Sequence, residues 1–304
     1  MIETTSISNN LEFKPKRNRE SLPAARVATR FFRPAPVFAI TSGKGGVGKT
    51  NVTANLAAAL ARRNQRVMVI DADLGLANLN LLLGITPAYT LADFFTGAAT
   101  LDEIIVANRS GILLLAGASG VPEMTALRAD QKAALLTELD ALTHEIDLVL
   151  VDTGSGISDA VTYFTAAAQE IVVVVTPEPS SMTDAYALVK VLASAHRQKH
   201  FWVLANNVEG AQEARRLFDA LSRTALRYLN ASLDFFGWIP RDPGLLRAVA
   251  RSRMVVEEAS DAPSAQAFVA LAERLMQMTA AGVKVKGNLQ FFLRRMLESK
   301  RGEG

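Results

Sequence analysis

The sequence predicts a doubly wound α/β fold, in which helices cover both faces of a mostly parallel β-sheet. Short apolar runs alternate with helical stretches along the 304 residues, and such continuous runs are typical of strands buried on both faces. A hydrophobic content of 49% is enough to fill the core of this domain. The expected strands are 37–40, 67–70, 112–115, 148–151, 171–175, 202–205 and 233–237.

The first strand leads into a Gly-rich segment, and a helix is expected over 51–63, with Leu56, Ala59 and Leu60 on one face. Glycines let consecutive backbone N–H groups turn inward around a polyphosphate, Lys49 reaches its terminal phosphates, and the Thr50 hydroxyl is a ligand for Mg²⁺. A nucleoside triphosphate with Mg²⁺ is therefore the expected ligand. The expected nucleotide-binding residues of this segment are Gly43, Gly45, Gly46, Val47, Gly48, Lys49, Thr50 and Asn51.

Acidic residues follow two of the other strands. Asp71 and Asp73 end the run at 67–70, and two residues that are two apart on a strand point the same way. One carboxylate could hold a Mg²⁺-bound water while the other orients an attacking water. The spacing alone also allows both to satisfy turn or helix-cap N–H groups. Asp152 ends the run at 148–151 and is followed by a Gly-rich turn through Gly156.

The segment 44–50, Lys-Gly-Gly-Val-Gly-Lys-Thr, resembles the deviant Walker A loop of the MinD/ParA ATPases. In that family the extra lysine, here Lys44, reaches across a nucleotide-sandwich dimer to the phosphates of the partner. The segment 71–78 resembles the switch I segment of that family, and the segment 148–156 resembles its Walker B strand running into switch II.

The resemblance implies a role for each acidic residue. Asp73 is expected to act with Lys44 and Lys49 in catalysis, and Thr50, Asp71 and Asp152 are expected to organise Mg²⁺, with Gly154 close to the γ-phosphate. It also implies that Asn206 reads the adenine edge and that Pro240 lies against the base. Asn207 competes with Asn206, and from the residues alone each of these could be an ordinary turn residue.

Composition excludes two classes of relative. The chain has no cysteine, so nucleotide-dependent proteins that carry iron–sulfur clusters are excluded. Related tyrosine kinases carry a tyrosine-rich tail, whereas the four tyrosines here all fall inside the expected folded region. They are Tyr89, Tyr163, Tyr186 and Tyr228. The histidines, His144, His196 and His200, lack metal-ligand spacing and are expected to be surface or structural residues.

The expected division of the chain is a basic arm over 1–35, an ATPase domain over 36–283 and a basic amphipathic tail over 284–304. The two tails together carry a charge of +8 against +3 for the whole chain, which leaves the domain acidic. An acidic domain disfavours nucleic acid as a partner. With no signal peptide or transmembrane run, the chain is expected to be cytoplasmic and peripheral at the inner face of the cell membrane.

The tail over 289–297 spaces apolar residues on one helical face, among arginines that suit anionic head groups. It resembles the membrane-targeting sequence of MinD-type proteins, although a helix of this kind could also dock on its own domain. At about twelve residues it is marginal in water and is expected to fold on binding. The residues expected at the membrane are Leu289, Phe291, Phe292, Leu293, Arg294, Arg295, Met296 and Leu297.

Two further stretches, 71–84 and 177–188, resemble the FlhG family, also called FleN or YlxH, which regulates flagellar number and placement. The resemblance implies a slow, Mg²⁺-dependent ATPase that is a homodimer when it binds ATP. The arm lacks the motif by which some FlhG proteins activate the GTPase FlhF. A flagellar transcription activator or a switch-ring protein is therefore the more probable partner. The alternatives are a MinD-type ATPase of division-site selection and a scaffold that binds ATP without hydrolysing it.

Overall fold

The computed structural model describes residues 35–73, 79–115 and 146–280. Its central feature is an eight-stranded sheet in the order β3-β4-β2-β5-β1-β6-β7-β8, in which β3 and β4 are antiparallel and every other neighbouring pair is parallel. The strands are β1 (Val37–Ser42), β2 (Val67–Ala72), β3 (Ile105–Ala107), β4 (Leu113–Leu115), β5 (Leu148–Ser155), β6 (Glu170–Val175), β7 (His200–Val208) and β8 (Ser232–Pro240).

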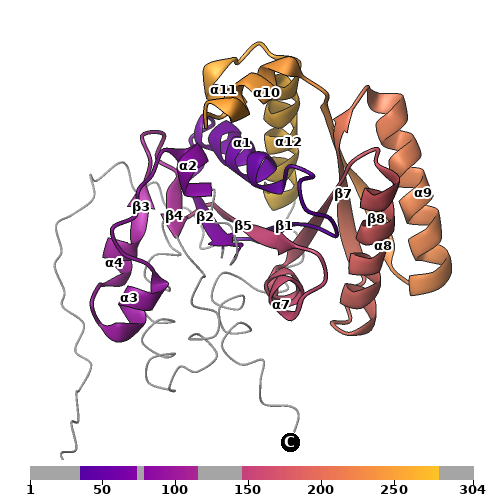
Figure 1. The fold of residues 1–304 in the computed structure, drawn as a ribbon, viewed down its shortest axis with the longest axis horizontal. Coiled ribbons are helices and arrows are strands. Elements are labelled where there is room, and N and C mark those ends of the chain that lie inside the picture. The colour runs from indigo at the N-terminus through magenta and orange to yellow at the C-terminus, as the bar shows by residue number, and fades with distance from the viewer. Residues whose placement is uncertain (1–34, 74–78, 116–145, 281–304) are drawn as a thin grey trace, which may run out of the picture.

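Helices cover both faces of this sheet, as Figure 1 shows. On one face are α1 (Lys49–Ala61), α2 (Leu79–Leu83), α10 (Pro243–Ala250), α11 (Val255–Glu258) and α12 (Pro263–Ala280). On the other are α3 (Leu91–Thr96), α4 (Leu101–Ile104), α7 (Asp159–Ala167), α8 (Pro179–Ser194) and α9 (Ala211–Leu229). The doubly wound fold and all seven expected strands are confirmed.

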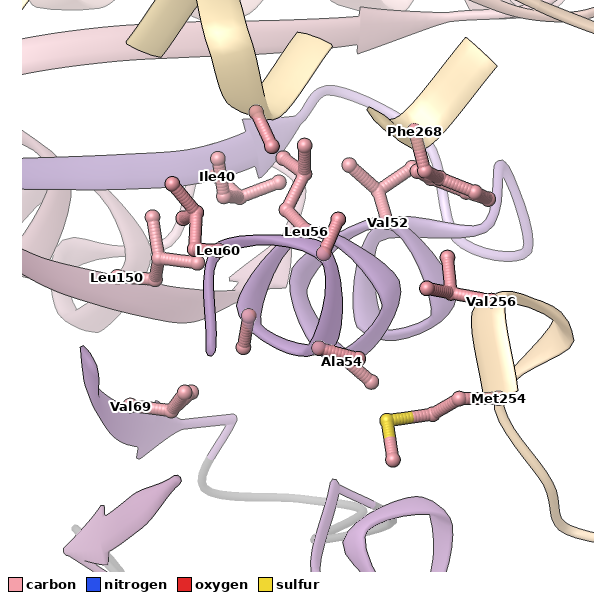
Figure 2. Packing of buried hydrophobic residues seen from close by; sticks show 14 of the residues in the cluster. Ile40, Val52, Ala54, Leu56, Leu60, Val69, Leu150, Met254, Val256 and Phe268 are labelled. Carbon is pink, nitrogen blue, oxygen red and sulfur yellow. The ribbon is translucent and has the colours of Figure 1, made fainter. Parts of the chain in front are cut away.

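Apolar residues of the sheet, α11 and α12 surround α1 in the core (Figure 2). Val52 lies on the side of α1 that faces Phe268 of α12, and Ala54 lies on the side that faces Met254, just before α11. Burial of this helix extends beyond the face of Leu56, Ala59 and Leu60, because Ala54, Ala57 and Ala58 are as inaccessible as Leu56. Small side chains let α2, α11 and α12 approach the remaining faces, and alanine also favours the helix itself.

One carboxylate joins two helices beside the last strand. Asp242 is the N-cap of α10, where its side chain accepts a hydrogen bond from Gly244 N at 2.7 Å. It also accepts from Ser264 N at 3.0 Å and Ser264 Oγ at 2.5 Å, in the first turn of α12. Burial would raise the pKa of Asp242, but these hydrogen bonds outweigh burial and lower it. The end of β8 is thereby fixed against both helices.

A cluster at the opposite end of the sheet makes stability depend on pH. His200, at the start of β7, lies with Nε2 2.8 Å from Asp234 Oδ2 and Nδ1 3.7 Å from Glu170 Oε2. The carboxylates of Glu170 and then Asp234 raise the pKa of His200 above its ordinary value of 6.5, despite partial burial. Because the pKa of His200 is higher in the folded state than in the unfolded state, its protonation stabilises the fold. This stabilisation is complete below pH 6.5 and is lost as pH rises through the folded-state pKa.

We therefore expect the thermal unfolding midpoint to fall more between pH 6 and 8 for the wild-type protein than for His200→Gln. Glutamine keeps a polar side chain at this position but cannot gain a proton. The measurement is the unfolding midpoint by circular dichroism at half-unit steps of pH. Parallel pH profiles for the two proteins would show that the imidazole is not responsible.

Candidate functional site

The Gly-rich segment forms a loop between the end of β1 and the start of α1. Gly46 and Gly48 have φ of 78° and 92°, in the left-handed region that side chains other than glycine rarely adopt. Gly48 is also the N-cap of α1, and the first turn of that helix contains no acidic residue. The unpaired N–H groups of this helix end, with the buried Lys49 beside them, make an anion-binding site.

Two carboxylates lie behind the loop on neighbouring parallel strands. Asp71 of β2 and Asp152 of β5 are partners in the sheet register, so their Cα atoms are adjacent. Asp152 is only 1% exposed and accepts hydrogen bonds from the hydroxyls of Thr50 and, at 3.1 Å, Thr53, both on α1. The structure therefore brings together Thr50, Asp71 and Asp152, which were expected to organise a metal ion.

Burial controls the charges of this group. It raises the pKa of Asp152 to about 7 and that of Asp71 to about 6, and it lowers the pKa of Lys49 although Asp152 and Asp73 oppose this. Burial therefore disfavours the charged form of both carboxylates, and an added cation would offset this cost. Because all the donors are oxygens, the residues present fit Mg²⁺.

Asp73 follows the end of β2, and its side chain lies beside the carboxyl end of β5. Its N–H donates to Asp71 Oδ1 at 3.1 Å. A Cβ placed on Gly154 would lie 3.6 Å from Asp73 Oδ1, so the carboxylate lies over this glycine. Its influence on the pKa of Lys49 shows that it is also close to the phosphate-binding loop. This position suits the expected role of Asp73, while residues 74–78 of the same segment lie outside the described residues.

The other expected catalytic residue, Lys44, is bound to α8. Its Nζ forms an ion pair with Glu178 Oε2 and donates to Ser180 Oγ at 2.8 Å. Gly43 also contacts this helix, since a Cβ there would lie 2.0 Å from the backbone oxygen of Asp184. The stretch 177–188, a family signature in the sequence, therefore packs directly on the phosphate-binding loop. The sequence indicated no role for Glu178, which is 134 residues away from Lys44.

Asn206 and Pro240 lie at the ends of β7 and β8, on the nucleotide side of the sheet. Asn206 is 7% exposed, and its Nδ2 donates to Val47 O at 2.7 Å. Its Oδ1 accepts from Asn207 N at 2.9 Å. Asn207 itself is exposed and left-handed, with φ of 57°. Pro240 is the register partner of Val208. The structure places Asn206 against the phosphate-binding loop, while contact of any of these residues with a base stays a prediction.

The expected membrane-binding residues 289–297 and the basic arm fall outside the described residues. Within the parts of the chain that the structure describes, no helix has both the length and the apolarity needed to cross a membrane.

Comparison of the sequence with known proteins gives a consistent result. The family model described as "CobQ/CobB/MinD/ParA nucleotide binding domain" matches residues 38–255. The antiactivator FleN of Pseudomonas aeruginosa is 42% identical over 265 residues, which cover 87% of this chain and 94% of FleN. The flagellum site-determining protein YlxH of Helicobacter pylori is 32% identical over 263 residues, covering 86% of this chain and 89% of YlxH.

Solved structures of similar fold include cell-division proteins. The MinD cell division protein of Aquifex aeolicus superposes with a TM-score of 0.62 at 28% identity, covering 80% of this chain and 97% of that one. The septum site-determining protein MinD of Pyrococcus horikoshii, solved as a complex with Mg-ADP, superposes with a TM-score of 0.63 at 26% identity. That superposition covers 83% of this chain and 100% of the Pyrococcus chain.

Proposed function

The chain belongs to the CobQ/CobB/MinD/ParA family of nucleotide-binding proteins, and from this premise we propose that it is a slow, Mg²⁺-dependent ATPase whose ATP-bound dimer controls flagellar number or placement. The observation that carries the proposal is the loop 43–50 with its two lysines, backed by the buried carboxylates Asp71 and Asp152. The relatives FleN and YlxH supply the flagellar part.

The site accounts for hydrolysis through positioning and charge. The loop N–H groups and Lys49 hold the phosphates, and Asp73 orients a water toward the γ-phosphorus. The water oxygen bonds to the γ-phosphorus as the bond between this phosphorus and the bridging oxygen breaks. The water passes a proton to an oxygen of the phosphate formed, and ADP leaves with the bridging oxygen. Mg²⁺, held by Thr50 with Asp71 and Asp152 behind it, would supply positive charge to the phosphate oxygens.

The contacts of Lys44 explain how ATP could control dimerisation. In the single chain its charge is satisfied by Glu178 and Ser180, whereas in a nucleotide-sandwich dimer it would contact the phosphates of the partner's ATP. The side chains of Lys44 and Glu178 are 33% and 60% exposed. An ion pair this exposed contributes only about 0–1 kcal/mol, so exchange for a phosphate contact is feasible.

Removal of the Glu178 charge should therefore favour the dimer. We expect Glu178→Gln to strengthen ATP-dependent dimerisation by up to about fivefold, which corresponds to ~1 kcal/mol. The measurement is the dimer dissociation constant by sedimentation velocity with a non-hydrolysable ATP analogue. Glu273→Gln, which removes a different exposed ion pair, the one with Arg63, is the matched control. Equal dimerisation of both variants and the wild type would show that the ion pair does not oppose dimer formation.

Membrane attachment is proposed to follow from dimerisation. One short amphipathic tail binds a bilayer weakly, and two tails on a dimer bind much more tightly through effective concentration. Co-sedimentation with liposomes that contain anionic lipids, in ATP and in ADP, tests this step. Equal binding to liposomes in ATP and in ADP would show that membrane attachment does not depend on the bound nucleotide.

The cellular role is tested by deletion of the gene and electron microscopy of the cells. Excess or misplaced flagella with normal division septa would support the flagellar role. Normal flagella with minicells would instead assign the same switch to division-site selection, an alternative favoured by the similarity to MinD proteins. Release of phosphate from ATP by the purified protein separates both from a scaffold that does not hydrolyse ATP.

A further inference from the structure

We infer that the hydroxyl of Ser155 donates a hydrogen bond to the γ-phosphate of the nucleotide, so that this residue helps the protein to distinguish ATP from ADP. The inference rests on the proposed function, because it assigns one more residue to the same nucleotide site. It adds a donor that the loop, the two lysines and the carboxylates do not supply.

The carboxyl end of β5 is held against the strand that leads into the phosphate-binding loop. Ser155 is the last residue of β5, and the sheet register pairs it with Ser42, the last residue of β1. The N–H of the next residue, Gly156, donates to Ser42 O at 2.9 Å. This end of β5 is therefore fixed beside the start of the loop.

The Ser155 side chain lies against the loop itself. A Cβ placed on Gly45 would lie 3.4 Å from Ser155 Oγ, which is ordinary contact distance. The preceding residue, Gly154, faces Asp73, because a Cβ there would lie 3.6 Å from Asp73 Oδ1. Two consecutive residues of β5 thus border the loop proposed to hold the phosphates and the carboxylate proposed to orient the water. A donor at this point is next to the phosphate that the water attacks.

The Ser155 hydroxyl is available to a ligand, whereas hydroxyls near it are engaged. Thr153 Oγ1 donates to Ile40 O at 3.1 Å, and Ser158 Oγ accepts from Val161 N at 3.5 Å as the N-cap of α7. Ser155 is exposed, and within the described part of the chain its hydroxyl makes no hydrogen bond. It can therefore donate to a ligand without breaking a contact inside the protein.

A hydroxyl at this place suits a phosphate oxygen. The hydroxyl donates one hydrogen bond, and the negative charge of the acceptor makes such a bond stronger than one between neutral groups. ADP lacks the γ-phosphate and would leave the Ser155 hydroxyl in water. The contact therefore favours the triphosphate over the diphosphate, and alanine at this position would lose that preference alone.

The first test compares nucleotides with and without the γ-phosphate. Calorimetry measures the binding of ADP and of a non-hydrolysable ATP analogue, each with Mg²⁺, to the wild type, Ser155→Ala and Ser155→Thr. We expect Ser155→Ala to bind the ATP analogue about 10-fold more weakly and ADP as the wild type does. Ser155→Thr keeps the hydroxyl, and its β-branched side chain suits a strand, so it should bind both nucleotides as the wild type does.

Ser232→Ala is the matched control for this test. It removes an exposed serine hydroxyl at the start of β8, the opposite end of the parallel sheet from the loop, and should bind both nucleotides with wild-type affinity. Unchanged binding of the ATP analogue to Ser155→Ala would overturn the inference. Equal losses for ADP and the analogue would also overturn it, because they would show that Ser155 supports the loop and does not contact the γ-phosphate.

The second test separates a contact within one chain from a contact across a dimer. Ser155→Ala is compared with Ser155 in a Lys44→Ala background, which lacks the lysine proposed to reach the partner. The difference in affinity for the ATP analogue should persist there, and its disappearance would overturn the inference.

Failure of the inference is distinguishable from failure of the proposed function. A wild-type protein that binds neither nucleotide would refute both. A wild type that binds both nucleotides but releases no phosphate from ATP would refute the ATPase alone, since the binding measurements would still decide the role of Ser155.

Discussion

Lys49→Ala should weaken ATP binding by roughly 100-fold or more and leave no measurable phosphate release. The ammonium group is buried against the loop, with its side chain beside Asp152 and Asp73, so its interaction with phosphate is only weakly screened. Calorimetry with ATP and a colorimetric assay for phosphate measure the two effects.

The fold should survive this substitution. Burial raises the pKa of Asp152 to about 7, so this carboxyl can take up a proton near neutral pH when its cationic neighbour is lost. The thermal unfolding midpoint, measured alongside binding, checks this. Lys190→Ala, on the exposed surface of α8, is the matched control and should behave as the wild type. Full ATP binding and turnover in Lys49→Ala would remove the basis for assigning 43–50 as a phosphate-binding loop.

Asp73→Ala should uncouple ATP binding from hydrolysis. We expect turnover to fall by roughly 10²–10³-fold, because the water loses the group that orients it, while ATP affinity stays within a few-fold. Since hydrolysis no longer empties the site, the variant should accumulate as an ATP-bound dimer that light scattering coupled to gel filtration can detect.

The position of Asp73 over Gly154 motivates this expectation, and it differs from that of the buried Asp71. Asp261→Ala, an exposed carboxylate in the turn before α12, is the control and should show wild-type turnover. A monomeric Asp73→Ala protein in saturating ATP would refute the role assigned to this residue, because it would mean that Asp73 is needed to form the ATP-bound state itself.

The sequence predicted those parts of the fold that local pattern determines. The parallel strands carry continuous apolar runs, and the loop at 43–50 is specified by glycines whose φ values few other residues can adopt. The strand β3 was not predicted, because it follows α4 without a break and none of its three residues is fully buried. The burial of α1 on all sides was also missed, because alanine is common on both buried and exposed helix faces and does not indicate which face is covered.

The contacts between distant segments could not be read from the sequence. Nothing near Lys44 indicates that Glu178 and Ser180 will hold it, because that depends on how α8 packs beside β1. Asn206 was identified as a nucleotide residue from family resemblance, but its contact with Val47 depends on the irregular end of β7. Residue types therefore predicted the members of the site, and only the tertiary structure shows which of them restrain one another.

The double cap at Asp242 has a consequence for how the domain unfolds. A single carboxylate satisfies backbone N–H groups at Gly244 in α10 and Ser264 in α12, so neither helix start can fray without disturbing the other. The two helices are thereby linked into one cooperative unit with the end of β8 that carries Pro240. Local opening at this edge would loosen the end of β8 and the last described helix together, as a single event.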